Sequence, residues 1–219
     1  EFPDCDAMQR SAISIGRRLQ DPLSELVKID PASIGVGLYQ HDARTGDLRE
    51  TLNDVVQACV SFVGVDLNRA STALLRYVSG LNQLTARRIQ EFRQERGPFK
   101  TRQQLLEVNG LGEATFVQAA GFLKIEDGDE PFDATWVHPE SYEAARKLLD
   151  RLGVAATALG KADSAATIET GLAAHDRAAL AEELGVGLLT LEQLVEALSK
   201  PRCDPRTDLP PPLFRKDGV

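Results

Sequence analysis

The chain has 219 residues, with 25 Lys and Arg against 33 Asp and Glu, a formal net charge of −8 at pH 7 and 42% hydrophobic residues. This length can hold one large domain or two to three small ones, and no apolar run approaches the roughly 18 residues that span a membrane. The three cysteines lie far apart, which favours a reducing cytoplasm over a disulfide framework, and the three scattered histidines give no metal-site spacing. The net acidity also argues against a protein whose whole surface binds nucleic acid.

The first fifty residues are expected to contain one amphipathic helix and a linker. The helical pattern covers residues 7–27 and is interrupted near Asp21-Pro22, because proline disfavours α geometry in the residue before it. Asp4 and Asp6 precede this helix, and two acids in that position are more often a solvated helix start than a metal site. In the linker, Gly35-Val36-Gly37 is too short to be a dinucleotide-binding fingerprint.

Two glycine hairpins thirty residues apart are the main feature of the next segment. Before them, Thr51 or Asn53 can start a helix whose apolar residues recur at a 3.6-residue period. The two copies align as a repeat that pairs Leu75 with Leu105, Val78 with Val108, Gly80 with Gly110, Leu81 with Leu111 and Thr85 with Thr115. Each copy has a short helix, a tight glycine turn and a second helix. We therefore predict a double helix-hairpin-helix domain over residues 51–125, with helices near 69–78, 84–96, 102–108 and 113–123.

The chemistry of such hairpins suits phosphate binding. Glycine tolerates positive φ, so it can turn the chain sharply and expose backbone N–H groups in a concave nest. The following helix adds unpaired N–H groups and the positive end of its dipole. Two copies related by a pseudo-two-fold axis would contact two phosphates at a fixed spacing, which positions nucleic acid without reading its sequence. Asn82 replaces the second glycine of the first copy and, as the next-best residue for a left-handed turn, predicts a weaker first hairpin.

Positive charge gathers on the same segment. Residues 66–125 carry nine Lys and Arg against five Asp and Glu, whereas residues 1–65 have a net charge of −4 and residues 126–219 a net charge of −8. A local basic face is enough to attract a polyanion. A solvated helix face remains the simpler interpretation of Arg93 and Arg96. The predicted nucleic-acid-binding residues are Gly80, Leu81, Asn82, Thr85, Arg87, Arg88, Lys100, Arg102, Gly110, Leu111, Gly112 and Thr115.

The composition changes after Ile125. An acidic turn leads into Ala-rich helical stretches over 140–151 and 176–185 and an apolar helix over 191–198, so residues 126–199 are predicted to form an acidic helical subdomain. Five prolines make residues 200–219 a stiff, extended linker. Because almost no strand pattern is present anywhere, the predicted fold class is all-α.

Several motifs together carry a resemblance to a known family. They include Arg17–Leu23, Val27–Pro31, Ser33–Gly37, Gly64–Asn68, the hairpin pair, Ala119–Leu123 and Val137–Glu140. With these motifs the chain resembles the Tex family of bacterial transcription accessory proteins over nearly all of its length up to the Pro-rich residues. The hairpin segment alone also resembles the DNA-uptake protein ComEA, but that likeness leaves both flanks unexplained.

The resemblance implies an arrangement of domains. Residues 1–27 would be the closing helix of an RNase H-like (YqgF) domain. This helix and the linker after it would together make up residues 1–50. The double helix-hairpin-helix domain and the acidic subdomain follow, and Val219 would fall just before an OB-type RNA-binding barrel. The resemblance also implies binding of RNA or DNA without sequence preference, a relation to a eukaryotic transcription elongation factor, and the transcription machinery as a further partner.

Two other classes of function compete with nucleic-acid binding. RNase H-like resolvases hydrolyse phosphodiesters with a metal held by clustered carboxylates, and their last helix usually offers an acid where the resemblance places Arg10. A two-metal mechanism cannot be assembled from the residues present, so we expect no enzymatic activity and no cofactor. The alternative to nucleic-acid binding is a protein–protein docking scaffold in which the hairpins are structural only, and it predicts binding that survives loss of both hairpins.

Overall fold

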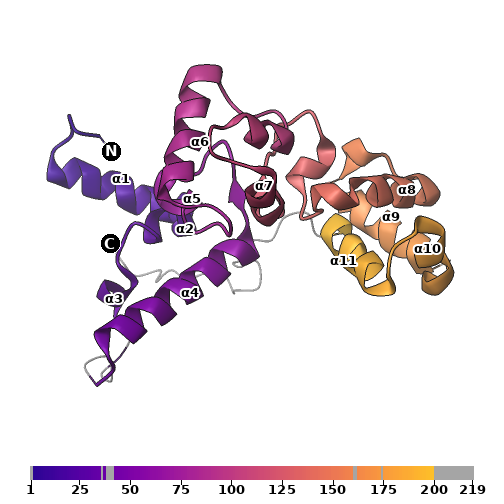
Figure 1. The fold of residues 1–219 in the computed structure, drawn as a ribbon, viewed down its shortest axis with the longest axis horizontal. Helices are drawn as coiled ribbons and strands as arrows, with labels where there is room; N and C mark the ends of the chain where they lie inside the picture. Colours follow the sequence, from indigo (N-terminus) through magenta and orange to yellow (C-terminus); the bar gives the residue numbers. More distant parts are fainter. Residues whose placement is uncertain (1, 36, 38–41, 160–161, 174, 200–219) are drawn as a thin grey trace, which may run out of the picture.

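The computed structural model describes residues 2–35, 37, 42–159, 162–173 and 175–199. Helices make up nearly all of its regular structure, which confirms the all-α prediction. Figure 1 shows α8–α11 gathered at the opposite end of the molecule from α1 and α3, with α5–α7 between them. The predicted Pro-rich linker over residues 200–219 lies outside the described residues.

The N-terminal part is a series of helices punctuated by proline and glycine. These helices are α1 (Ala7–Gln20), α2 (Pro22–Leu26), α3 (Pro31–Ile34) and α4 (Thr45–Val63). Asp21 ends α1 and its side chain accepts a hydrogen bond from the Ser24 N–H at 3.1 Å, so the predicted break falls at Asp21-Pro22. The helix α4 begins at Thr45, six residues before the earliest start that the sequence indicated.

The repeat folds as two helix–turn–helix units around a shared core. The first unit contains α5 (Thr72–Leu75) and α6 (Gln83–Arg96), and the second contains the 3-10 helix η2 (Arg102–Glu107) and α7 (Glu113–Ala120). Equivalent apolar positions are buried in both copies, with Leu75 and Leu105 fully inaccessible. The leading helix of each copy is shorter than predicted, and in the second copy it is a 3-10 helix.

A two-stranded contact that the sequence did not predict closes this unit. The strand β1 (Val65–Asp66) pairs in parallel with β2 (Leu123–Lys124), with Val65 opposite Leu123. The Val65 N–H donates to the Phe122 carbonyl at 2.8 Å, and the Leu67 N–H donates to the Lys124 carbonyl at 2.8 Å. The residues that enter and leave the repeat are therefore joined by backbone hydrogen bonds.

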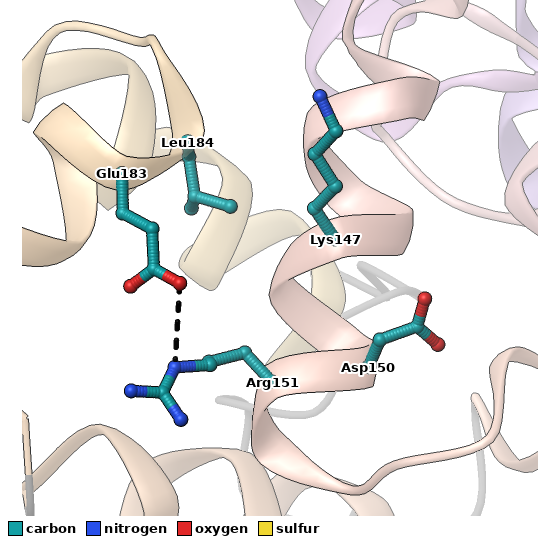
Figure 2. Close-up of a pocket in the computed structure, with 5 residues that line it drawn as sticks. All are labelled: Lys147, Asp150, Arg151, Glu183 and Leu184. Carbon is teal, nitrogen blue, oxygen red and sulfur yellow. Dashed lines mark ion pairs between the residues drawn. The ribbon is translucent and has the colours of Figure 1, made fainter.

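A second hydrophobic core is formed by residues between Phe132 and Leu198. Its elements are η3 (Pro131–Ala134), η4 (Pro139–Ser141), α8 (Tyr142–Leu152), η5 (Ala156–Ala158), α9 (Ala162–Ala173), α10 (Arg177–Leu184) and α11 (Leu188–Ser199). No helix was predicted over the residues of α9. Figure 2 shows α8 and α10 facing each other across a small pocket, where Arg151 Nε lies 3.6 Å from Glu183 Oε1.

Candidate nucleic-acid interface

The two hairpins have the same backbone geometry. Gly80 and Gly110 both have φ of +82°, which L side chains rarely adopt. The Leu81 N–H donates to the Val78 carbonyl at 3.0 Å, and the equivalent bond from Leu111 to Val108 is also 3.0 Å. This combination is typical of a type II turn with glycine at its third position. Leu81 and Leu111 are buried and anchor the turns, so only their backbone can face a ligand.

Each hairpin packs on the second helix of the other copy. A Cβ at Gly80 would lie 2.9 Å from Gln118 Cβ and 3.2 Å from the Thr115 carbonyl oxygen. A Cβ at Gly110 would lie 1.9 Å from Arg88 Nη1. Gln118 and Arg88 are equivalent positions of the repeat, as are the two glycines. The reciprocal contacts give the unit its pseudo-two-fold character. At Gly80 they leave no room for a Cβ, whereas at Gly110 the Arg88 guanidinium can move aside and the positive φ is what favours glycine.

The predicted reason for a weaker first hairpin is wrong. Asn82 has φ of −131° and is not in the left-handed region. It is instead the N-cap of α6, where its side-chain oxygen accepts hydrogen bonds from the Leu84 and Thr85 N–H groups at 2.9 and 3.0 Å. The Asn82 N–H donates to Thr85 Oγ1 at 2.8 Å, so Thr85 is buried in a closed capping box and does not face solvent.

The second hairpin has free backbone N–H groups at the helix start, where those of the first hairpin are capped by a side chain. Gly112 is the N-cap of α7, with an extended φ of −90°, and it has no side chain to cap the helix. Within the described part of the chain, no acceptor is recorded for the N–H groups of Gly110, Gly112, Ala114 or Thr115. Phe116 donates to the Gly112 carbonyl and begins the intrahelical bonds. The free N–H groups at the start of α7 are the kind of site that binds anions.

The basic residues around the hairpins differ in how far they are already engaged. Arg88 Nη1 donates to the Asn109 carbonyl at 2.9 Å, which places its guanidinium beside the second hairpin. Arg87 and Lys100 are exposed, and no side-chain partner is recorded for them among the described residues. The others are held by protein groups: Arg93 donates to the Leu67 and Ala70 carbonyls, and Arg96 pairs with Glu107 at 2.8 Å.

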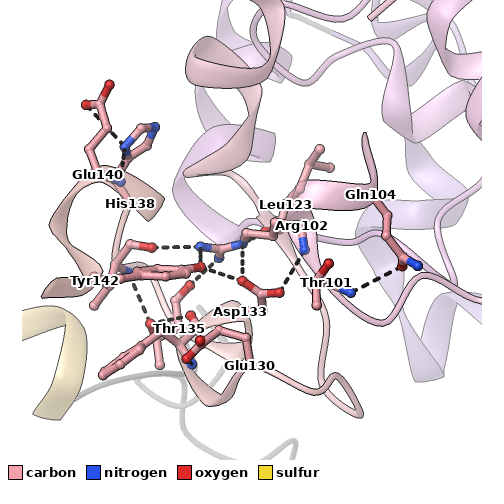
Figure 3. A network of polar contacts seen from close by, with 12 residues as sticks. Thr101, Arg102, Gln104, Leu123, Glu130, Asp133, Thr135, His138, Glu140 and Tyr142 are labelled. Carbon is pink, nitrogen blue, oxygen red and sulfur yellow. Dashed lines mark hydrogen bonds and ion pairs between the residues drawn. The ribbon is translucent and has the colours of Figure 1, made fainter. Parts of the chain in front are cut away.

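The structure contradicts the predicted phosphate contact of Arg102. Its side chain is 1% exposed, and Figure 3 shows the guanidinium inside a polar network between the two cores. The network is built from hydrogen bonds that Arg102 donates to the Leu123 carbonyl (2.6 Å), the Thr135 carbonyl (2.6 Å), the Val137 carbonyl (2.7 Å) and the Tyr142 hydroxyl (2.9 Å). A buried guanidinium with these partners cannot also reach a phosphate in solvent.

Asp133 is the anionic partner in this network. One of its carboxylate oxygens accepts the Arg102 backbone N–H at 2.7 Å, and the other accepts the Tyr142 hydroxyl and lies 3.9 Å from Arg102 Nε. Burial raises the pKa of Asp133 above its usual value, although the hydrogen bonds from Tyr142 and Arg102 and the Arg102 charge oppose the rise. Burial likewise raises the pKa of Tyr142. Arg102 therefore joins the hairpin unit to the helices that follow it.

A second pair of glycine turns lies in the C-terminal core. Gly153 and Gly185 have φ of +68° and +67° and end α8 and α10. The Val154 N–H donates to the Leu149 carbonyl at 2.9 Å and the Val186 N–H to the Ala181 carbonyl at 3.0 Å, as in Schellman motifs. The repeated Leu-Gly-Val sequence was the signal that could have revealed this pair.

The segment that contains these turns is strongly acidic. Residues 126–199 carry only five Lys and Arg against fifteen Asp and Glu.

The described residues contain no group of three or more His, Cys, Asp or Glu side chains placed to hold a metal ion. In the same residues, no helix is both long and apolar enough to cross a membrane.

Comparison with known proteins agrees with this geometry. Residues 60–124 match the helix-hairpin-helix motif family, and residues 130–206 match the HHH domain family. The transcriptional accessory protein Tex of Neisseria gonorrhoeae is 49% identical over 207 residues, which cover 94% of this chain and 26% of the relative. The chain is homologous to part of Tex.

Further relatives extend the Tex likeness. Protein YhgF of Escherichia coli is 46% identical over 220 residues, covering 100% of this chain and 27% of the relative. The human S1 RNA-binding domain-containing protein 1 is 37% identical over 268 residues, with the same coverage of 100% and 27%. The chain spans about 26–30% of the length of the curated relatives it matches. The HHH domain match over residues 130–206 identifies a second helix-hairpin-helix unit in a part of the chain that was predicted only to be helical.

Proposed function

We propose that this segment of a Tex-like transcription accessory protein binds the phosphate backbone of RNA or DNA without sequence preference. The observation that carries the proposal is the second hairpin, where free N–H groups of Gly112, Ala114 and Thr115 lie at a helix start. The Arg88 guanidinium adjoins that hairpin and adds a positive charge. Backbone N–H groups and a cation together suit a phosphate oxygen.

The first hairpin has a secondary part in this proposal. Its type II turn presents Gly80 in the same way, but the Asn82 side chain occupies the N–H groups of Leu84 and Thr85. Exposed Arg87 and Lys100 supply the remaining charge. The names of the relatives support the proposal in general terms, since one relative is named for an S1 RNA-binding domain and another as a transcriptional accessory protein.

The second helix-hairpin-helix unit is assigned no nucleic-acid contact. The acidic unit, residues 126–199, carries fifteen acidic residues against five basic ones, which repels a polyanion, and its two glycine turns are closed by Schellman hydrogen bonds. This charge favours a second candidate function, the docking of a protein partner through the acidic unit, with the first pair of hairpins being structural only.

The proposal is tested by fluorescence anisotropy of the full chain with single- and double-stranded RNA and DNA across a salt series. A variant with Gly110→Val and Gly112→Val should bind more weakly to all four nucleic acids. Valine at position 110 disfavours the φ of +82°, so the turn must reshape, and valine at position 112 adds a side chain beside the free N–H groups at the start of α7. Circular dichroism checks that the helices remain. If this variant stays folded and binds as tightly as the parent, the hairpins are structural and the docking function is the better account.

A matched control uses Gly185→Val, which places the same substitution at a left-handed glycine of the acidic unit. An added Cβ at Gly185 meets nothing within 4 Å, so the change strains the backbone without displacing a neighbour. Its nucleic-acid affinity should equal that of the parent. Equal weakening by both variants would point to a general loss of structure instead of a lost phosphate contact.

A further inference from the structure

A groove of about 460 Å³ lies along α11 in the acidic unit, between that helix and α9. Its floor is apolar, since Leu172 of α9 and Leu191 of α11 are 5% and 1% exposed, and Val195 is half-buried. Leu191, Val195 and Ser199 recur every four positions, so one face of α11 lines the groove.

The rim of this groove carries uncompensated negative charge. Glu169, Glu192 and Glu196 line it together with a single cation, Arg177. Arg177 Nη1 lies 3.9 Å from Glu192 Oε1, whereas no ion pair of Glu169 or Glu196 is recorded within the described residues. The rim therefore has a net charge of −2 and two carboxylates that a cationic ligand can reach.

A buried polar atom at the end of the groove also lacks a partner. The Ser199 hydroxyl oxygen is buried and makes no hydrogen bond to any described residue. Leaving such a group unsatisfied is unfavourable, and native structures rarely tolerate it. An occupant that brings backbone N–H or C=O groups past Ser199 would remove this cost.

We propose that the groove binds the segment that directly follows α11 in the sequence, residues 200–206. This segment, Lys200-Pro201-Arg202-Cys203-Asp204-Pro205-Arg206, has three cations and one acid, so its charge of +2 complements the rim. Its two prolines favour extended backbone. The match to the HHH domain family continues to residue 206, past the end of α11 at Ser199, which groups these residues with the unit that carries the groove.

The reach of the segment agrees with this placement. The twelve residues of α11 make a helix about 18 Å long at roughly 1.5 Å per residue. Seven extended residues cover about 23 Å at roughly 3.3 Å per residue. Seven extended residues are therefore long enough to follow α11 from its end to its start, along a groove that Glu196 and Glu169 line.

The test compares two charge reversals in the full chain by hydrogen–deuterium exchange. One variant carries Arg202→Glu and Arg206→Glu, and its matched control carries Arg215→Glu and Lys216→Glu, which changes the net charge equally. We expect the first variant to exchange the amides of α9 and α11 about three- to tenfold faster than the parent, because two ion pairs become repulsive. The control should exchange at the parent rate.

Rescue separates a specific contact from a general effect of charge. Adding Glu169→Arg and Glu196→Arg to the first variant restores opposite charges across the groove, at two exposed positions. Exchange should then return toward the parent rate. Equal exchange in the two reversal variants, or no rescue, overturns the proposal and leaves a basic segment of another protein as the occupant. Since exchange is the readout, the outcome is independent of phosphate binding at the first pair of hairpins.

Discussion

Replacing Arg102 with methionine should destabilise the protein more than any change on the surface of the hairpin unit. Methionine keeps much of the side-chain volume but has no N–H donor. The change removes the donors of three carbonyl groups and of the Tyr142 hydroxyl, all in a site where Arg102 is 1% exposed. It also leaves the Asp133 carboxylate without the nearby cation.

The size of the effect follows from these contacts. A buried acceptor that loses its donor costs about 1–3 kcal/mol, and breaking a buried ion pair costs about 3–5 kcal/mol. The contributions are not additive, because Asp133 keeps the hydrogen bonds from the Tyr142 hydroxyl and the Arg102 backbone N–H. We therefore expect the free energy of unfolding to fall by about 3–5 kcal/mol, a large share of the roughly 5–15 kcal/mol that holds a typical domain.

Urea unfolding at pH 7 measures this loss with two probes. Far-UV circular dichroism reports the helices, and fluorescence reports Trp136, the single tryptophan. Its ring centroid lies 3.5 Å from Lys124 Nζ on β2. The control Arg87→Met removes the same charge from an exposed position and should change the free energy of unfolding by less than about 0.5 kcal/mol. A loss below about 1 kcal/mol for Arg102→Met would refute the assignment of Arg102 as the joint between the two units.

Three further predictions concern single features of the hairpin unit and its joint. Asn82→Gly frees two N–H groups at the start of α6, so the affinity for single-stranded RNA, measured by anisotropy, should rise by up to about tenfold. The free energy of unfolding should fall by only a few tenths of a kcal/mol. Unchanged affinity would show that the first hairpin contacts no phosphate. Neutralising Arg87 and Lys100 with Gln should weaken binding to all sequences alike and reduce the log–log salt slope by roughly 0.7–0.9 per lost contact, whereas an unchanged slope assigns them to a solvated face. Burial already raises the pKa of Asp133 in the parent, and Arg102→Met removes a positive charge that opposes this rise. A folded-state pKa above the unfolded value means that protonation favours the folded state, so the free energy of unfolding of Arg102→Met should increase as pH falls from 7 to 5. Adding Asp133→Asn should abolish that increase.

The repeat was predictable because several independent positions agree in both copies. Glycine at positions 80 and 110 indicated turns with positive φ, and the structure gives both residues the same φ of +82°. The apolar positions around them repeat with the same spacing, and their burial follows from it. The second helix-hairpin-helix unit carries a weaker form of this signal, a repeated Leu-Gly-Val, without the surrounding positive charge that drew attention to the first.

Arg102 could not be placed from the sequence because a basic residue looks the same locally whether it faces solvent or a buried carboxylate. Its partners lie 21 to 40 residues further along the chain, in β2, η3 and the start of α8. The parallel pair of β1 and β2 is hidden for a similar reason: two residues in each strand are too few to show an alternating pattern, and the partners are 58 positions apart.

Asn82 shows how one residue type can support two opposite structural interpretations. Asparagine is favoured both in left-handed turns and at helix N-caps, and the sequence gives no means of choosing between them. In the structure Asn82 is an N-cap, and this gives it a different effect on the N–H groups of the first hairpin from the one predicted. A left-handed asparagine would merely distort a nest, whereas a capping asparagine fills it with its own side-chain oxygen. The N–H groups at the start of α6 are then already bonded to an internal acceptor. Under the proposed function a phosphate must displace that acceptor at the first hairpin, whereas no acceptor is recorded for the Gly112 N–H group among the described residues.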